Sequence, residues 1–135
     1  MRHILPHKNI PLLVLDRGGR FFGDGLYIVF GGILHPFNPK KEPLPNINSN
    51  LIIIVDSVIN TGNTLERLIK ELKKRNPCVS ICLATNVIQR AALARFKELP
   101  LFAIRVSDNK YIGKKQSFQD GDSGPDTADR LFNLI

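Results

Sequence analysis

The chain has 135 residues, of which 43% are hydrophobic and 23% charged, and its formal net charge is +7 at pH 7. This length suits one domain with one hydrophobic core. No apolar run is long enough for a transmembrane helix, and the first residues lack the apolar stretch of a secretory signal, so a membrane or secreted protein is not expected.

The first half of the chain predicts two strands, a helix between them and a long loop. Pro11–Asp16 reads as a strand, and Phe22–Phe30 as a short helix ended by Gly31 and Gly32. A short strand is expected at Ile33–His35. Residues Pro36–Asn50, rich in proline and asparagine, predict a surface loop.

The second half predicts three strands separated by helices. The expected elements are a buried strand at Leu51–Val55, a helix at Thr64–Arg75, a strand at Val79–Leu83, a helix at Val87–Lys97 and a strand at Leu101–Val106. This alternation predicts an α/β fold: a single domain of three layers, in which helices flank both faces of a parallel sheet.

The cysteines and histidines indicate neither a disulfide nor a metal site. Cys78 and Cys82 fall on one face of a predicted strand, too far apart for good disulfide geometry. Buried, reduced thiols in a cytoplasmic protein are the better interpretation. The three histidines have no carboxylate or cysteine at metal-ligand spacing, and no protein metal site is expected.

The most informative segment is the loop between the strand ending at Val55 and the helix starting at Thr64. Asp56 stands at the predicted carboxyl edge of the strand, where α/β sheets bind ligands, and its carboxylate could accept hydrogen bonds from a ribose diol. The residues Asn60, Thr61, Gly62, Asn63 and Thr64 follow. Their backbone N–H groups, at the positive end of a helix, would form a phosphate site. The alternative is an ordinary strand–helix turn with an Asn or Thr cap.

These residues resemble the signature by which phosphoribosyltransferases bind 5-phosphoribosyl 1-pyrophosphate (PRPP). That family joins a hydrophobic strand to one or two acidic residues and a loop containing Thr-Gly-x-Thr/Ser. Asp56 fits the first acidic position, and Ser57 stands at the second. The uracil-specific branch of the family also lacks the second acid.

An earlier segment, Pro11–Leu26, resembles the pyrophosphate loop of the uracil branch. Arg17 and Gly18 fall at the positions that face pyrophosphate in that family, and Arg20 follows nearby. Arginines around glycines form a basic turn suited to a polyanion. The alternative is a glycine turn with two solvated arginines.

The C-terminal region resembles the nucleobase-binding part of the uracil branch. Tyr111, Ile112 and Gly113 match a segment whose backbone reads the pyrimidine edge, and Asp126 opens a matching ending. The residues Lys114–Pro125 are interposed between the two matches, unlike in the family. A capped final helix is the alternative for the residues from Asp126 on.

The resemblance implies an enzyme that transfers phosphoribosyl from PRPP to a nucleobase, most closely uracil, with Mg²⁺ as the cofactor. It leaves a homodimer open, although the family's helical N-terminal arm is missing. The rival hypothesis is a protein of the same fold that binds PRPP, a nucleotide or RNA without catalysis. The net charge of +7 has three possible interpretations: an ordinary solvated basic surface, a positive potential that attracts PRPP, or a surface that binds RNA. RNA is the less favoured partner because aromatics are not interleaved with the basic residues.

Overall fold

Strands and helices alternate along the chain, as the sequence predicts. The computed structural model of the protein describes residues 9–16, 18–108, 111–112 and 123–124. Its elements are β1 (Pro11–Leu15), α1 (Gly19–Phe30), β2 (Ile33–Phe37), β3 (Leu51–Ile59), α2 (Asn63–Arg75), β4 (Ser80–Gln89), the 3-10 helix η1 (Arg90–Phe96), β5 (Leu101–Ser107), β6 (Tyr111–Ile112) and β7 (Ser123–Gly124).

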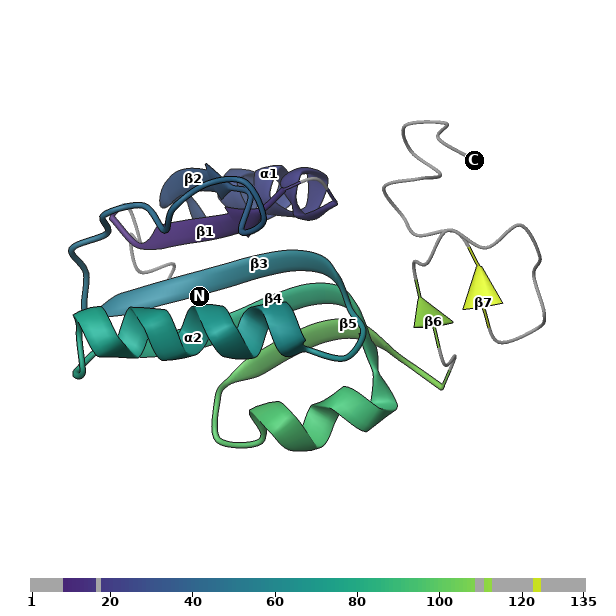
Figure 1. Cartoon of the computed structure of the whole chain (residues 1–135). Coiled ribbons are helices and arrows are strands. Elements are labelled where there is room, and N and C mark those ends of the chain that lie inside the picture. Colours follow the sequence, from purple (N-terminus) through teal and green to yellow (C-terminus); the bar gives the residue numbers. More distant parts are fainter. Residues whose placement is uncertain (1–8, 17, 109–110, 113–122, 125–135) are drawn as a thin grey trace, which may run out of the picture.

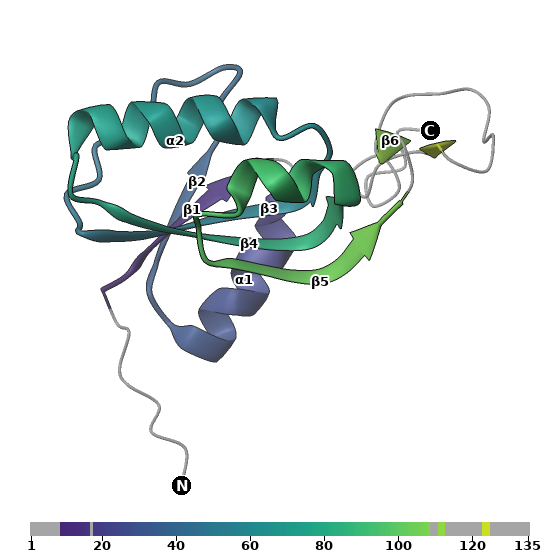
Figure 2. The same ribbon diagram turned by 90° about the horizontal axis from the view of Figure 1, so that it is seen from below.

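The first five strands form one parallel sheet in the order β2-β1-β3-β4-β5 (Figure 1). Helices α2 and η1 cover one face of this sheet, and α1 covers the other (Figure 2). The prediction of a three-layer α/β fold is therefore confirmed. The short strands β6 and β7 pair with each other in a separate two-stranded sheet.

The sheet separates two hydrophobic cores of unequal size. Side chains alternate along β1, so that Leu13 and Leu15 face α2 whereas Leu12 and Val14 face α1. The larger core lies under α2 and η1, and α2 contributes four buried residues to it: Leu65, Leu68, Ile69 and Leu72. These are the residues that the helical period of the sequence assigns to the core face.

The two central strands extend further than expected. The expectation that the strand ends at Val55 is wrong, because β3 continues to Ile59. The β-branched pair Val58–Ile59 continues the parallel pairing with Val87–Ile88 of β4, and β-branched residues favour strands. The expected end of β4 at Leu83 is wrong for the same reason.

The helix expected at Val87–Lys97 is also corrected. Residues up to Gln89 belong to β4, and Arg90–Phe96 form a 3-10 helix rather than an α-helix. Ile88, Ala92 and Phe96 are all buried and spaced by four, which is the period of a helix face. Only the last two lie on the helix, however, since Ile88 reaches the same core from the strand.

Smaller corrections concern β2 and the thiols. Strand β2 extends to Phe37 and includes Pro36, which is tolerated because β2 is an edge strand. Both cysteines are free, as expected. The expected burial is wrong for Cys78, which is exposed in the turn before β4. Cys82 is half-buried, and its burial raises the pKa of its thiol.

Within the described residues, no helix is long and apolar enough to cross a membrane.

The β3 strand should carry much of the stability of the fold. Ile54 is 1% exposed in the larger core, so Ile54→Ala should lower the free energy of unfolding in urea by about 2–5 kcal/mol. Ile104 on β5 is 65% exposed and is the matched control. Ile104→Ala should change the free energy of unfolding by no more than about 0.5 kcal/mol. Equal losses in the two variants would contradict this account of the core.

Candidate functional site

The loop that connects β3 to α2 lies at the carboxyl edge of the sheet. The expectation that Asp56 stands at that edge is wrong. Asp56 lies inside β3, where it pairs in register with Thr85 of β4. Its side chain is half-buried. The correction follows from the extra strand residues, which move the turn to Asn60–Gly62.

The side chains of β3 depart from strict alternation between the two faces of the sheet near Asp56. Ile54 and Ile59 both point into the larger core although they are five residues apart, and strict alternation would place them on opposite faces. The change occurs where the Thr85 hydroxyl donates to the carbonyl of Ser57 or of Val87, at 3.2 and 3.1 Å. Ser57 itself is 3% exposed, and its Oγ has no hydrogen-bond partner among the described residues. A polar atom is therefore buried without a protein partner directly beside Asp56.

The conformation of the turn is set at Gly62. Gly62 is the N-cap residue of α2 and has a left-handed conformation, with φ 80° and ψ 4°. Gly62 has no side chain that could cap the helix, so the usual N-cap side-chain acceptor is missing. The Asn63 N–H makes a long hydrogen bond of 3.4 Å to the Thr61 hydroxyl. The structure thus brings together the five predicted residues Asn60–Thr64 at one helix start.

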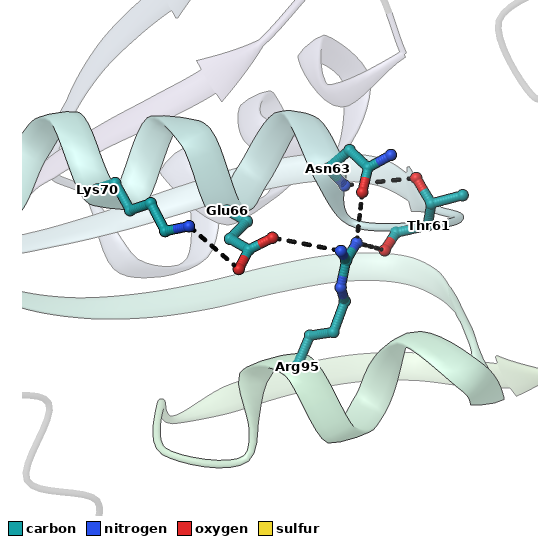
Figure 3. Close-up of polar contacts among 5 residues, drawn as sticks. All are labelled: Thr61, Asn63, Glu66, Lys70 and Arg95. Carbon is teal, nitrogen blue, oxygen red and sulfur yellow. Dashed lines mark hydrogen bonds and ion pairs between the residues drawn. The ribbon is translucent and has the colours of Figure 1, made fainter.

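The 3-10 helix η1 supports this turn from one side (Figure 3). A Cβ atom on Gly62 would lie 2.6 Å from the ring of Phe96, so the turn rests directly on that ring. Arg95 donates hydrogen bonds to the Thr61 carbonyl and to Oδ1 of Asn63, the latter at 2.6 Å. Its other terminal nitrogen lies 3.3 Å from Glu66 of α2.

Sequence reasoning missed Arg95 and Phe96 as parts of the site. The buried spacing of Ala92 and Phe96 is visible in the sequence and marks Phe96 as a core residue. No sequence signal connects Arg95 to Thr61, because the two residues are 34 positions apart and meet only through the parallel pairing of β3 and β4.

The start of α1 forms a second wall beside Asp56. A Cβ atom on Gly19 would lie 2.9 Å from the carbonyl oxygen of Val55 and 3.3 Å from Cα of Asp56. Only glycine allows this close approach. Gly18 is the N-cap residue of α1. Two segments that the sequence analysis selected separately, the arginine–glycine turn and the Asp56 strand, therefore lie against each other.

The remaining predicted residues are not tested by side-chain geometry. Arg17, Gly113 and Asp126 lie outside the described residues, as does most of the interposed segment Lys114–Pro125. Tyr111 and Ile112 are described as strand β6 only, through their backbone pairing with β7. The pyrophosphate and nucleobase assignments that rest on them stay predictions.

The charged groups of the described site do not form a metal cage. Among the residues that the structure describes, no three His, Cys, Asp or Glu side chains gather into a group that could hold a metal ion.

A separate surface pair, Arg90 and Asp108, links the start of η1 to the end of β5. Their mutual hydrogen bond, assisted by charge attraction, raises the pKa of Arg90 and lowers that of Asp108.

Comparison with known proteins identifies the family. Residues 8–119 match the sequence profile of the family described as "Phosphoribosyl transferase domain". No curated protein sequence matches the chain significantly.

Several solved structures share the fold. The AQ2163 protein from Aquifex aeolicus aligns with a TM-score of 0.67 at 21% identity, over 96% of this chain and 68% of its own. TT1426 from Thermus thermophilus aligns with a TM-score of 0.63 at 15% identity, over 89% of this chain and 87% of its own. The xanthine-guanine-hypoxanthine phosphoribosyltransferase from Helicobacter pylori gives a TM-score of 0.56 at 19% identity, over 74% of each chain.

Substituting Gly62 should disrupt the turn specifically. Gly62→Ala places a methyl group against Phe96 and forces a left-handed alanine, which costs roughly 1–2 kcal/mol before any clash. Gly25→Ala is the matched control, since a Cβ there meets nothing within 4 Å and alanine favours a helix by roughly 0.5–1 kcal/mol. Unfolding in urea should show a loss of stability for Gly62→Ala and none for Gly25→Ala. Equal stability of both variants would contradict the geometry of the turn.

Proposed function

Because this chain belongs to the family of phosphoribosyl transferase domains, we propose that it transfers the phosphoribosyl group of PRPP to a nucleobase in nucleotide salvage. Uracil is the first candidate base, which makes UMP and pyrophosphate the products. The observation that carries the proposal is the turn Asn60–Thr64, with a left-handed glycine at the start of α2 and Asp56 on the strand before it.

The turn and Asp56 suit the phosphoribosyl part of the substrate. The 5′-phosphate would bind at the N-terminus of α2, where N–H groups and the helix dipole favour an anion. The Asp56 carboxylate would accept hydrogen bonds from the ribose hydroxyls. Asp56 is separated by only three residues from Asn60, so one segment of chain would hold both the sugar and its phosphate.

The pyrophosphate is assigned to Arg17 and Gly18. Gly18 caps α1, whose first residue, Gly19, packs on the backbone of Val55 and Asp56. This contact supports the assignment, because it puts the end of the arginine–glycine turn beside the proposed ribose site. A guanidinium there would neutralise charge that grows on the leaving group.

The reaction needs no protein nucleophile. A ring nitrogen of the base attacks C1 of the ribose, and the C1–oxygen bond breaks with its electron pair leaving on pyrophosphate. The base loses the proton of that nitrogen. The protein's task is to hold the nitrogen near C1, to exclude water and to stabilise the leaving charge. Tyr111, Ile112, Gly113 and Asp126 are proposed to surround the base.

Mg²⁺ is compatible with this site as an ion brought by PRPP. The described residues offer no cluster of three protein ligands, and Mg²⁺ usually takes most of its oxygens from substrate phosphates and water. Among the described residues of the proposed site, Asp56 offers a carboxylate that could complete such a shell. When bound, the ion would offset negative charge on the pyrophosphate.

A second candidate is a regulatory protein that binds PRPP, a nucleotide or RNA without catalysis. One observation favours it. Phosphoribosyltransferases of the uracil branch carry Tyr-Arg-Asp after the second strand, whereas this chain has Phe37, Asn38 and Pro39. Phe37 is 4% exposed in the core, and none of the three residues carries the charge that Arg and Asp supply in the uracil branch.

Uracil turnover with PRPP and Mg²⁺ tests the enzyme against the binding protein. We expect saturable UMP formation in the unmodified protein, with other bases tested as competitors. Tight PRPP binding without nucleotide formed from any common base, at several pH values, would favour the second candidate.

Replacing Asp56 tests the ribose site. Asp56→Asn removes the charge that would accept two hydroxyl bonds, so calorimetry should show PRPP binding weakened by about 10- to 150-fold. Glu98→Gln is the control, since this carboxylate is 86% exposed beyond η1 and outside the proposed site. Unchanged PRPP affinity in Asp56→Asn would remove Asp56 from the site.

Replacing Arg17 tests the pyrophosphate assignment. Arg17→Ala should weaken PRPP far more than ribose 5-phosphate, which lacks the pyrophosphate group. Arg20→Ala should do less, because Arg20 lies on the exposed side of α1 and does not match the family position. The measurement is the affinity of each variant for both ligands. Equal losses for both ligands in Arg17→Ala would indicate general electrostatics instead of a pyrophosphate contact.

A further inference from the structure

Arg95 makes an unusually complete set of contacts for a half-exposed side chain. One terminal nitrogen, Nη1, donates both to the carbonyl of Thr61 and to Oδ1 of Asn63. The other, Nη2, pairs with Oε2 of Glu66 at 3.3 Å, and Glu66 also pairs with Lys70 at 3.5 Å (Figure 3). The guanidinium therefore bridges the turn, the first turn of α2 and its own helix η1.

The contact with Thr61 decides the orientation of a peptide group. A trans peptide is planar, and its C=O and N–H point in opposite directions. Because the Thr61 carbonyl points to Arg95 on the side of η1, the N–H of Gly62 points to the opposite side of the turn. That is the side on which the proposed phosphate would lie.

The opposite orientation of this peptide would be poorly tolerated. It would turn the Gly62 N–H toward Arg95 and Phe96. A guanidinium carries only donors, and the Phe96 ring fills the space directly at Gly62. The turned peptide would lose the hydrogen bond that the Thr61 carbonyl now accepts, and its N–H would face a positive charge instead. Arg95 thus favours one peptide orientation and opposes the other.

We propose that Arg95 is a positioning residue that sets the phosphate-binding turn by fixing the Thr61–Gly62 peptide. The inference rests on the proposed function only in taking the bound anion to be the 5′-phosphate. Arg95 does not touch that phosphate, because it lies on the other side of the peptide. Its planar fork is what the role requires, since it must reach a carbonyl, an amide oxygen and a carboxylate together.

Arg75 offers a matched control at the other end of α2. Its Nη1 donates to the carbonyl of Leu44 at 2.9 Å, and its Nη2 pairs with Glu71 at 2.9 Å. Its side chain is 45% exposed, against 40% for Arg95. Arg75→Ala therefore removes a similar carbonyl bond, together with an ion pair inside α2, far from the turn along the helix.

The test compares Arg95→Ala, Arg95→Lys and Arg75→Ala by calorimetry with ribose 5-phosphate. Both Arg95 variants should bind about tenfold more weakly, which corresponds to one lost hydrogen bond to a charged group. Arg75→Ala should bind as the unmodified protein does. Full affinity in Arg95→Lys would show that positive charge alone suffices and would overturn the proposal. An equal loss in Arg75→Ala would reduce the effect to general stability and would also overturn it.

A ligand-free measurement separates this inference from the proposed function. In ¹⁵N-labelled protein, the amide signals of Gly62 and Asn63 should shift or split in Arg95→Lys and stay unchanged in Arg75→Ala. Unchanged turn signals in Arg95→Lys would overturn the role of Arg95 whatever the protein binds. Absence of ribose 5-phosphate binding to the unmodified protein, with the turn signals altered in Arg95→Lys, would instead refute the proposed function and leave the positioning role supported.

Discussion

The parallel pairing of β3 with β4 is the constraint on which the candidate site depends. The register runs from Leu51 opposite Ser80 to Ile59 opposite Ile88, so the two strands end together at one edge of the sheet. The turn after β3 and the helix η1 after β4 consequently begin side by side. Residues 34 positions apart, Thr61 and Arg95, meet because the two strands are in this register. A slip of the register would separate the turn from its support and would turn the buried side chains to the other face.

The site is built where backbone meets backbone or an aromatic ring without an intervening side chain. Gly19 lets the start of α1 reach the carbonyl of Val55, and Gly62 lets the turn rest on Phe96. At both places a Cβ atom would come within 3.0 Å of a neighbour. Such contacts hold the two proposed anion-binding turns close to Asp56. The large core under α2 makes this arrangement stiff, since well-packed interiors transmit small displacements.

The sequence alone predicted the order of the elements, the parallel sheet, the core face of α2 and the loop that carries the proposed site. The sequence-based prediction was wrong where the local residue pattern disagrees with the pairing of β3 and β4. The polar residue Asp56 resembles a strand end, but pairing with β4 continues the strand to Ile59. The four-residue spacing of Ile88, Ala92 and Phe96 resembles one helix, but the first of these lies on a strand. Arg95 could not be found, because its role arises from tertiary contact and not from neighbouring residues.

The phosphate side of the proposed reaction depends on fewer parts of the chain than the base side. The turn, its support on η1 and the Asp56 strand form one packed unit of β3, α2, β4 and η1. If the turn binds the 5′-phosphate as proposed, its held conformation loses little conformational freedom on binding, so affinity for a phosphate would need no contribution from the base. Catalysis asks for more, because the base nitrogen must also be aligned with C1. Under the proposed function, a protein with this unit would keep a phosphoribosyl ligand while its base site changes. The same fold would then suit an enzyme or a binding protein, and the residues assigned to the base would decide between them.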